Sequence, residues 1–189
     1  GDLVHILYEA TYNDVEYIFD DSITSIAQDG VGASVTFERA APRTFDFVVG
    51  ADGLHSNVRR LAFGEESQFT RDMGCYVAIF PAANDYHLDS WELIYQIPGS
   101  RGTAGRSVGI YPIHGNSEVS AMFYFAAPHM TYDRRDVLQH KQMVARTFAG
   151  EGWEVPRLLT AMWTAPDFYF DRIAQTHMEQ WSSGRVALL

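Results

Sequence analysis

Apolar side chains recur with two different periods along this chain, and the change of period marks its elements. Near the start, four of them are spaced by three and four residues, which predicts a short amphipathic helix with Asp2 at its N-cap. These four are Leu3, Ile6, Leu7 and Ala10. The segments 15–19, 23–28 and 33–38 follow. They are rich in β-forming residues and separated by Asp and Gly turns, which predicts a small antiparallel meander.

A different kind of strand is predicted over Phe45–Val49. This run is almost continuously apolar and ends abruptly at Gly50-Ala51-Asp52-Gly53. The pattern is typical of a buried parallel strand that ends at a functional turn. A short helix is predicted soon afterwards, over residues 58–62.

From about Met73 the chain changes to longer β-type runs that are rich in aromatic residues. Four of these runs are joined by loops containing Gly, Pro or Asn, which predicts a sheet with one face covered. The runs are 75–81, 91–97, 107–112 and 119–126. A helix is predicted to begin at Asp133 and to stop near Gly150, and a second helix to run from Pro156 to Trp163. Further strands are predicted at 168–173 and 185–189.

Composition narrows the class of protein. The chain has 189 residues, of which 47% are hydrophobic and 20% are charged, so it can bury a core and is not disordered. Its 24 acidic and 14 basic side chains give a formal charge of −10. Without runs of Lys or Arg, this balance excludes a general surface for nucleic acid or anionic membrane. No apolar run approaches the roughly 18 residues of a membrane span.

Several kinds of site are not expected. The single cysteine, Cys75, cannot form an internal disulfide, so we expect a cytoplasmic protein. The seven histidines are scattered with no pair at helical ligand spacing, and we expect no metal site. Gly30-Val31-Gly32 looks like the start of a GxGxxG dinucleotide turn, but Val35 stands at the third glycine position. Because the segment also links two predicted strands, a hairpin is the better interpretation.

One motif is specific. The segment Phe47 to Arg60, with the sequence FVVGADGLHSNVRR, closely resembles the DG motif of the flavin-dependent aromatic hydroxylases, the para-hydroxybenzoate hydroxylase family of group A monooxygenases. The segment 181–189 looks like the strand that, in this family, runs into a Gly-Asp-Ala motif holding the flavin ribityl chain. Gly1-Asp2-Leu3 is similar to the start of the helix that follows an Arg contacting the flavin. The resemblance covers nearly the whole chain.

The resemblance implies a mixed α+β / α/β fold in two parts. Residues 1–64 would form part of an FAD-binding domain of the glutathione-reductase-like Rossmann type. Residues 65–180 would form a substrate-binding β-sheet domain covered by helices, and residues 181–189 a strand returning to the FAD-binding domain. The family's N-terminal GxGxxG and C-terminal Gly-Asp motifs are absent from the sequence. We therefore expect an internal fragment of a longer enzyme, inactive by itself.

Four residues of the DG motif are predicted to bind the cofactor. Asp52 can accept hydrogen bonds from sugar hydroxyls, and the resemblance implies that it supports the flavin ribose region and that the motif helps NAD(P)H to dock. Gly53 tolerates positive φ and lets the backbone approach a ligand closely. Ser56 can cap a helix beginning near Asn57, and Arg59 can meet a phosphate or a carboxylate. The alternative is that Asp52-Gly53 is only a turn and Arg59 a solvated helix residue.

The sequence defines a substrate pocket less well. Many aromatic residues after position 75 would suit a planar apolar substrate, but most belong to core packing. In relatives a Pro-containing strand end lies near the flavin ring, which makes Tyr111-Pro112-Ile113 the expected flavin-facing edge. Arg106 and His114 are candidates to anchor a phenolate or carboxylate, with a surface role as the alternative for either. No catalytic acid or base can be named.

The function implied by the resemblance is that of an FAD-dependent, NAD(P)H-using monooxygenase. Such an enzyme transfers oxygen from O2 to an aromatic or polyketide-like small molecule. Two alternatives stay open. The first keeps the fold without oxygen insertion, as a flavin-dependent reductase or halogenase. The second is a non-catalytic β-rich binding module, which predicts a self-contained domain.

Overall fold

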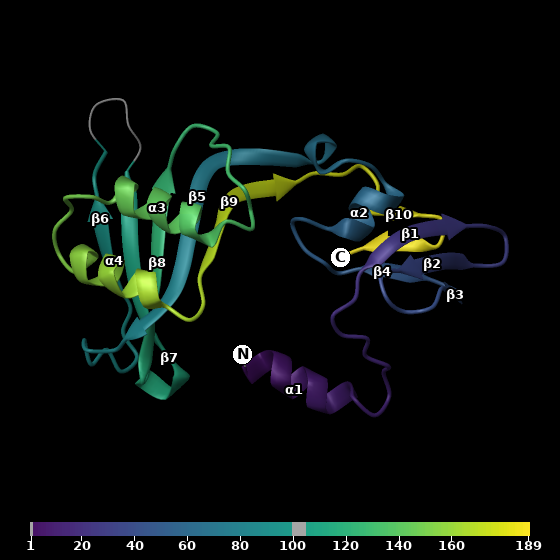
Figure 1. Ribbon diagram of the computed structural model, residues 1–189, viewed down its shortest axis with the longest axis horizontal. Coiled ribbons are helices and arrows are strands. Elements are labelled where there is room, and N and C mark those ends of the chain that lie inside the picture. Colours follow the sequence, from purple (N-terminus) through teal and green to yellow (C-terminus); the bar gives the residue numbers. More distant parts are fainter. Residues whose placement is uncertain (1, 100–104) are drawn as a thin grey trace. The chain divides into compact units, whose positions relative to one another are not determined.

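The computed structural model describes residues 2–99 and 105–189, apart from the side chain of Asp2. The chain divides into two compact units. Unit 1 comprises Gly1–Phe69 together with His177–Leu189, and unit 2 comprises Thr70–Thr176. Unit 1 is therefore assembled from both ends of the chain, and unit 2 is continuous between them (Figure 1).

Unit 1 is built from short elements. They are α1 (Asp2–Thr11), β1 (Ile23–Gln28), β2 (Ala33–Phe37), β3 (Arg43–Phe45), β4 (Val48–Gly50), α2 (Asn57–Ala62), the 3-10 turn η1 (Glu66–Gln68), β10 (Ser182–Ser183) and β11 (Val186–Leu188). The strands β1, β2 and β3 form an antiparallel meander in that order. In a second sheet β4 pairs in parallel with β11, and β10 pairs antiparallel with β11.

The hairpin expected at Gly30-Val31-Gly32 is confirmed. The segment joins β1 to β2, and Asp29 Oδ1 accepts hydrogen bonds from the amides of Val31 at 2.7 Å and Gly32 at 2.9 Å. An Asp that binds the backbone two and three residues ahead is a common device for closing a turn. The glycines therefore serve a hairpin and not a dinucleotide site.

The predicted meander is correct in kind but wrong in one member. Residues 15–19 form no strand, and β3 takes the third place instead. Aromatic contacts hold the 15–19 segment: the rings of Tyr17 and Phe19 stack with centroids 5.7 Å apart, and Tyr17 packs edge-on against Tyr8 of α1 at 4.9 Å. The predicted strand 45–49 is also interrupted, because its two ends pair in different sheets as β3 and β4.

The N-terminal helix forms as predicted, but its apolar face does not pack into a core. Leu3, Ile6 and Leu7 are each more than half exposed. Gly1 and the side chain of Asp2 lie outside the described residues, so the predicted capping role of Asp2 stays a prediction. The core of unit 1 lies elsewhere, between the two sheets and α2, and contains Ala33, Val35, Val48, Val58, Met178, Val186 and Leu188.

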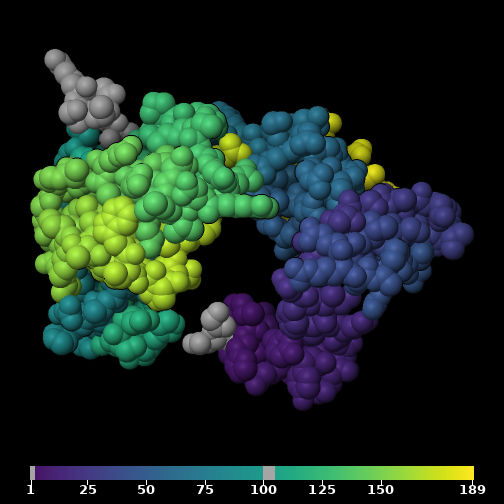
Figure 2. Space-filling view, in the orientation of Figure 1, coloured from purple at the N-terminus to yellow at the C-terminus, as the bar shows by residue number. Residues whose placement is uncertain are grey.

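Unit 2 is organised around a single antiparallel sheet. Its elements are β5 (Thr70–Ala83), β6 (Leu93–Ile97), β7 (Arg106–Ile113), the 3-10 turn η2 (His114–Asn116), β8 (Glu118–Ala126), α3 (Val137–Thr147), α4 (Val155–Thr164) and β9 (Tyr169–Thr176). The strand order is β6-β7-β8-β5-β9. Both helices lie over the same face of this sheet and form the green to yellow-green surface seen in Figure 2.

The core of unit 2 lies between the sheet and its helices. Alternate strand residues such as Tyr76, Phe80 and Phe123 are fully buried and pack against Phe148 and Leu158. Side chains of a strand point alternately to its two faces, so the buried set shows which face the helices cover. The sequence prediction of a sheet with one face covered is confirmed.

The start of α3 differs from the sequence prediction. The helix begins after Asp136, whose Oδ1 accepts a hydrogen bond from the Gln139 amide at 2.9 Å, and not at Asp133. Asp133 belongs to the preceding turn, where its carboxylate accepts from the Arg135 amide. A capping residue is identified by the helix amide that its side-chain oxygen reaches. The sequence alone does not show which of two Asp residues three positions apart reaches that amide.

No helix among the described residues is long and apolar enough to cross a membrane.

Candidate functional site

The two segments singled out in the sequence lie next to each other in unit 1. Val186 pairs with Val48, and Leu188 pairs with Gly50, so β11 and β4 run side by side in the same direction. The Leu189 amide continues the pairing by donating to the Gly50 carbonyl at 2.9 Å. Parallel strands in mixed folds bind ligands beyond their carboxyl ends. The carboxyl end of β4 is the start of the Gly50-Ala51-Asp52-Gly53 turn.

Gly50 allows α2 to pack directly against this strand end. A Cβ at position 50 would lie 2.7 Å from Val58 Cβ and 2.7 Å from Leu188 Cδ2, closer than any real contact. Gly53 has a different requirement. Its φ is +76°, and its carbonyl accepts from the Ser56 amide at 3.1 Å. Only glycine adopts this backbone conformation without strain, and it turns the chain back into α2.

Asp52 and Ser56 together cap the first turn of α2. The Ser56 hydroxyl donates to Asp52 Oδ1 at 2.5 Å and accepts from the Arg59 amide at 2.9 Å. The other carboxylate oxygen, Asp52 Oδ2, accepts from the Val58 amide at 3.0 Å. These bonds satisfy amides that have no partner inside the helix. The capping role predicted for Ser56 is confirmed.

The same contacts set the charge of Asp52. Partial burial by itself raises the pKa of this carboxyl, but hydrogen bonds from the Ser56 hydroxyl and from the backbone amides of Val58 and Asn57 outweigh it. The pKa of Asp52 therefore lies below its ordinary value. The side chain is an anion at neutral pH. Asp52 keeps part of its surface exposed, and each carboxylate oxygen has a second lone pair for a further donor.

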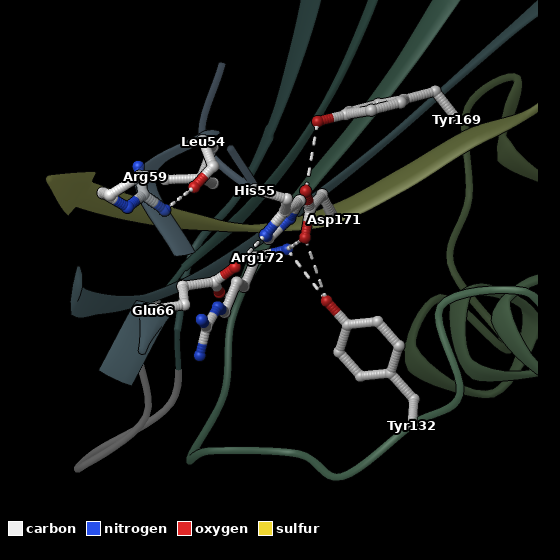
Figure 3. Close-up of polar contacts among 8 residues, drawn as sticks. All are labelled: Leu54, His55, Arg59, Glu66, Tyr132, Tyr169, Asp171 and Arg172. Carbon is white, nitrogen blue, oxygen red and sulfur yellow. Dashed lines mark hydrogen bonds and ion pairs between the residues drawn. The ribbon is translucent and has the colours of Figure 1, made fainter. Parts of the chain in front are cut away.

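Arg59 is almost fully buried, with 3% of its surface exposed, so it is not a solvated helix residue. Its Nη2 donates to the Leu54 carbonyl at 2.5 Å (Figure 3). Its Nε has no hydrogen-bond partner within residues 2–99 and 105–189. Arg59 therefore holds the loop that follows Gly53.

A cleft opens beside the end of β4. Its volume is about 360 Å³. The lining residues come from the start of β1, the end of β4 and the turn into α2: Asp21, Ser22, Ile23, Val49, Gly50, Ala51, Asp52, His55, Asn57 and Val58. His55 is held by Glu66, whose Oε2 lies 2.9 Å from His55 Nδ1 (Figure 3).

Of the four predicted cofactor residues, only Asp52 lines this cleft. Gly53 forms the turn beside it, whereas Ser56 and Arg59 are buried and support that turn. Sequence reasoning missed the contribution of Asp21. Its carboxylate accepts from the amides of Ser22, Arg39 and Ala40 at 2.8 to 3.1 Å. An Asp-Asp pair between two β segments signals only a turn, so nothing in the sequence indicated that it also borders a cleft.

The chemistry of this cleft fits the sugar part of a dinucleotide. An ionised carboxylate with spare lone pairs accepts hydrogen bonds from vicinal hydroxyls, and the open glycine turn lets a ligand approach the backbone. A space of about 360 Å³ is large enough for a portion of such a ligand but not for a whole FAD molecule. Among the described residues, no three His, Cys, Asp or Glu side chains gather in a way that would hold a metal ion.

The two candidate anchors in unit 2 have other partners. Arg106 donates to the Thr147 carbonyl and the Glu151 carboxylate, and its guanidinium lies over the Phe148 ring at 5.5 Å. It therefore fastens the sheet to the end of α3. His114, in the exposed turn η2, has its Nδ1 2.6 Å from Glu118 Oε2. Neither residue lines the cleft beside Asp52.

Comparisons with known proteins bear on the function. No protein-family model matches the sequence. The uncharacterised protein Rv1260 of Mycobacterium tuberculosis is 46% identical over 188 residues, which are 100% of this chain and 49% of that protein. A flavin-dependent monooxygenase of Legionella longbeachae is 34% identical over 190 residues, 100% of this chain and 47% of that protein.

A solved structure is also similar to this chain along its whole length. The crystal structure of the tetracycline destructase Tet(55) has 33% sequence identity and a TM-score of 0.85, and the match covers 100% of this chain and 48% of that one. The predicted mixed α+β architecture is thus shared with a known structure. The chain spans about half the length of the curated relatives it matches, and these relatives include proteins named as flavin-dependent monooxygenases.

Proposed function

We propose that this chain forms the central part of an FAD-dependent, NAD(P)H-using monooxygenase of the group A type. Unit 1 would contribute part of the flavin site and unit 2 the surface that receives a small ring-containing substrate. The similarity along the whole chain to a protein named as a flavin-dependent monooxygenase, and to the structure of a tetracycline destructase, supports this proposal. Because those relatives are about twice as long, the activity belongs to the whole protein.

The observation that carries the proposal is the position of Asp52. It stands at the carboxyl end of β4, beside β11, with its carboxylate in the cleft. Asp52 would accept hydrogen bonds from the ribose region of FAD, and the Gly53 turn would let the cofactor approach the backbone. Ser56 and Arg59 would act on the cofactor through the turn, by holding Asp52 and the Leu54 carbonyl in place.

The redox chemistry would be supplied by the bound flavin, which accepts a hydride from NAD(P)H and activates O2. The protein's own task is then to hold the flavin, orient the substrate and exclude water. The sheet of unit 2 offers a broad surface for the second task. The Tyr111-Pro112-Ile113 segment, at the end of β7, remains the proposed flavin-facing edge.

The test uses the full-length protein that contains this chain. We expect near-stoichiometric FAD after gel filtration, oxidation of NADH or NADPH, and transfer of one atom of labelled O2 to an added aromatic or polyketide-like substrate. NAD(P)H oxidation without label in any product would favour a flavin-dependent reductase instead. Failure to retain or to bind FAD would contradict the proposal as a whole.

The isolated 189-residue chain is expected to be colourless and inactive. It contains no GxGxxG turn to place the pyrophosphate of FAD at a helix N-terminus. The visible absorbance of the protein after gel filtration in excess FAD would measure any retained flavin. Stoichiometric retention of FAD would contradict this expectation.

The cytoplasmic location expected from the sequence stays a prediction.

A further inference from the structure

One carboxylate of unit 2 lies on the face of the sheet that the helices leave uncovered, which we call the open face. Val108 and Ile110 of β7 are fully buried in the core beneath the helices, so Gly109 between them faces the other way. Gly109 pairs with Ile94 of β6 and with Met122 of β8. These three neighbouring positions form an apolar part of the open face.

The carboxylate is that of Glu92, an exposed residue directly before β6. Its Oε1 lies 3.7 Å from the position of a Cβ built at Gly109, and Met122 Cε lies 3.6 Å from the same point. Because Gly109 has no side chain, the carboxylate can lie close to the sheet, beside the apolar positions.

The backbone around Glu92 is fixed on both sides. Before it, the Trp91 amide donates to the Leu88 carbonyl at 2.8 Å, and Leu88 is buried in the core. After it, Leu93 pairs with Ile110 in the sheet. The position of the Glu92 side chain on the open face is therefore set by the fold of unit 2.

Glu92 has no counter-ion on this face. Among the described residues, no hydrogen bond or ion pair reaches its side chain. The strand residues of the five-stranded part of the sheet are all described, and they place no Lys or Arg on the open face. Arg106 of β7 and Arg172 of β9 fall in the opposite register, on the side that the helices cover.

The other carboxylates near the open face differ from Glu92 in this respect. Glu118, at the start of β8, has its Oε2 2.6 Å from His114 Nδ1. Asp171 of β9 is 6% exposed and accepts hydrogen bonds from the hydroxyls of Tyr132 and Tyr169. Glu92 is thus the carboxylate of this region that a ligand on the open face can reach.

We propose that Glu92 is a specificity-determining residue that selects ring substrates carrying a protonated amine. This inference rests on the proposed function, under which unit 2 receives the substrate. The ring would cover Ile94 and Met122, and its ammonium group would donate a charge-assisted hydrogen bond to the Glu92 carboxylate. The ring would also exclude water from the charge pair, and this strengthens the attraction between the two charges.

The test compares two ligands that share one ring system, 2-naphthylmethylamine and 2-naphthylmethanol. Each is titrated calorimetrically into the flavin-loaded full-length protein at neutral pH, where the amine is a cation and the alcohol is uncharged. We expect the amine to bind about fivefold more tightly, at the upper end of the range for ion pairs near solvent. Equal or tighter binding of the alcohol, or no binding of either ligand, overturns the proposal. The flavin content of the same sample tests the proposed function separately.

A pair of charge-removing variants locates the effect. Glu92→Gln removes the negative charge and keeps the size of the side chain, so the preference for the amine should disappear while the affinity for the alcohol stays unchanged. Asp167→Asn is the matched control. It removes one negative charge from an exposed position two residues before β9, at the opposite edge of the sheet from β6, and should keep the preference.

Two outcomes of this comparison would overturn the proposal. A preference for the amine that survives in Glu92→Gln would place the cation elsewhere on the protein. Loss of the preference in both variants would mean that the formal charge of −10, and not Glu92, attracts the amine.

Discussion

The hydroxyl of Ser56 donates to the carboxylate of Asp52 at 2.5 Å, and this bond joins the turn after β4 to the first turn of α2. Because the same hydroxyl accepts from the Arg59 amide, the carboxylate is oriented by the helix that it helps to cap. Asp52 therefore has a structural role in the fold and, under the proposed function, a second role toward the cofactor. Substitutions at the two residues can separate these roles.

Asp52→Ala in the full-length protein should weaken FAD binding by about tenfold to a hundredfold. The reason is the loss of hydrogen bonds to a charged acceptor, each worth roughly 1.5–3 kcal/mol, with every 1.4 kcal/mol being about a factor of ten. FAD titrated into the apoproteins of the parent and the variant measures the dissociation constants.

Ser56→Ala is the matched control for that experiment. It removes a capping bond, for which about 1 kcal/mol of stability is typical, but it keeps the carboxylate. The melting temperature should fall, and FAD affinity should fall by a smaller factor than in Asp52→Ala, because the carboxylate remains and its Oδ2 keeps the bond from the Val58 amide. Equal losses of FAD affinity in both variants would show that Asp52 acts only through the cap.

Gly50→Ala should destabilise unit 1. The added methyl would lie 2.7 Å from Val58 Cβ and from Leu188 Cδ2, so α2 and β11 must move apart. Overpacking of this kind costs about 1–3 kcal/mol. The free energy of unfolding in urea measures the loss. Gly30→Ala is the comparison, because no atom lies within 4 Å of a Cβ built at that position and its stability should be unchanged.

The stability of unit 2 should fall at alkaline pH through Tyr132. Burial, together with the nearby Asp171 carboxylate, raises the pKa of the Tyr132 phenol to about 12, against an ordinary value of 10.0. A group whose pKa is raised by folding contributes stability that is fully present below its unfolded pKa. That contribution is lost as pH rises through the folded value. Urea unfolding at intervals from about pH 9 to about pH 12 follows the loss.

Tyr132→Phe provides the reference for this pH series. The variant lacks the ionisable hydroxyl, so its free energy of unfolding should fall less steeply between pH 10 and 12 than that of the parent. Phenolate absorbance should show the corresponding group titrating late in the folded parent. Parallel pH profiles for the two proteins would contradict the assignment.

Asp136→Ala should destabilise α3 more than Asp133→Ala does. Asp136 accepts from the Gln139 amide of the helix, whereas the Asp133 carboxylate accepts from the Arg135 amide in the preceding turn. Removal of an N-cap side chain costs about 0.5–2 kcal/mol. Thermal unfolding of the two variants compares them directly, and a larger effect at Asp133 would place the functional start of the helix earlier than the structure does.

Much of the fold follows from local patterns in the sequence. Alternation of apolar residues predicts the strands of the large sheet, and the turn chemistry at Asp29 predicts the first hairpin. The failures occurred where contacts between side chains or between strands, and not local composition, decide the outcome. Residues 15–19 have strand-like composition, but Tyr17 finds Tyr8 and Phe19 instead of a neighbouring strand. The run 45–49 was divided because each end meets a different sheet.

The candidate site shows the same limit. The DG motif singled out Asp52 and Gly53 as candidate cofactor residues. The capping role of Ser56 could be predicted because Ser56 stands just before the predicted helix. The burial of Arg59 could not, because an arginine on a short polar segment is exposed in most proteins. Nor could the presence of Asp21 beside Asp52 in one cleft, since that depends on how the meander folds over the end of β4.

The pairing of β4 with β11 also bears on the order in which the protein forms during synthesis. All of unit 2 lies between these two strands in the chain, so β4 leaves the ribosome long before its partner exists. The large sheet, whose strands are continuous in sequence, can close first. We expect the turn containing Asp52 to become fully ordered only after residues 186–189 have emerged, so that capture of a cofactor there would follow, and not guide, the folding of the inserted unit.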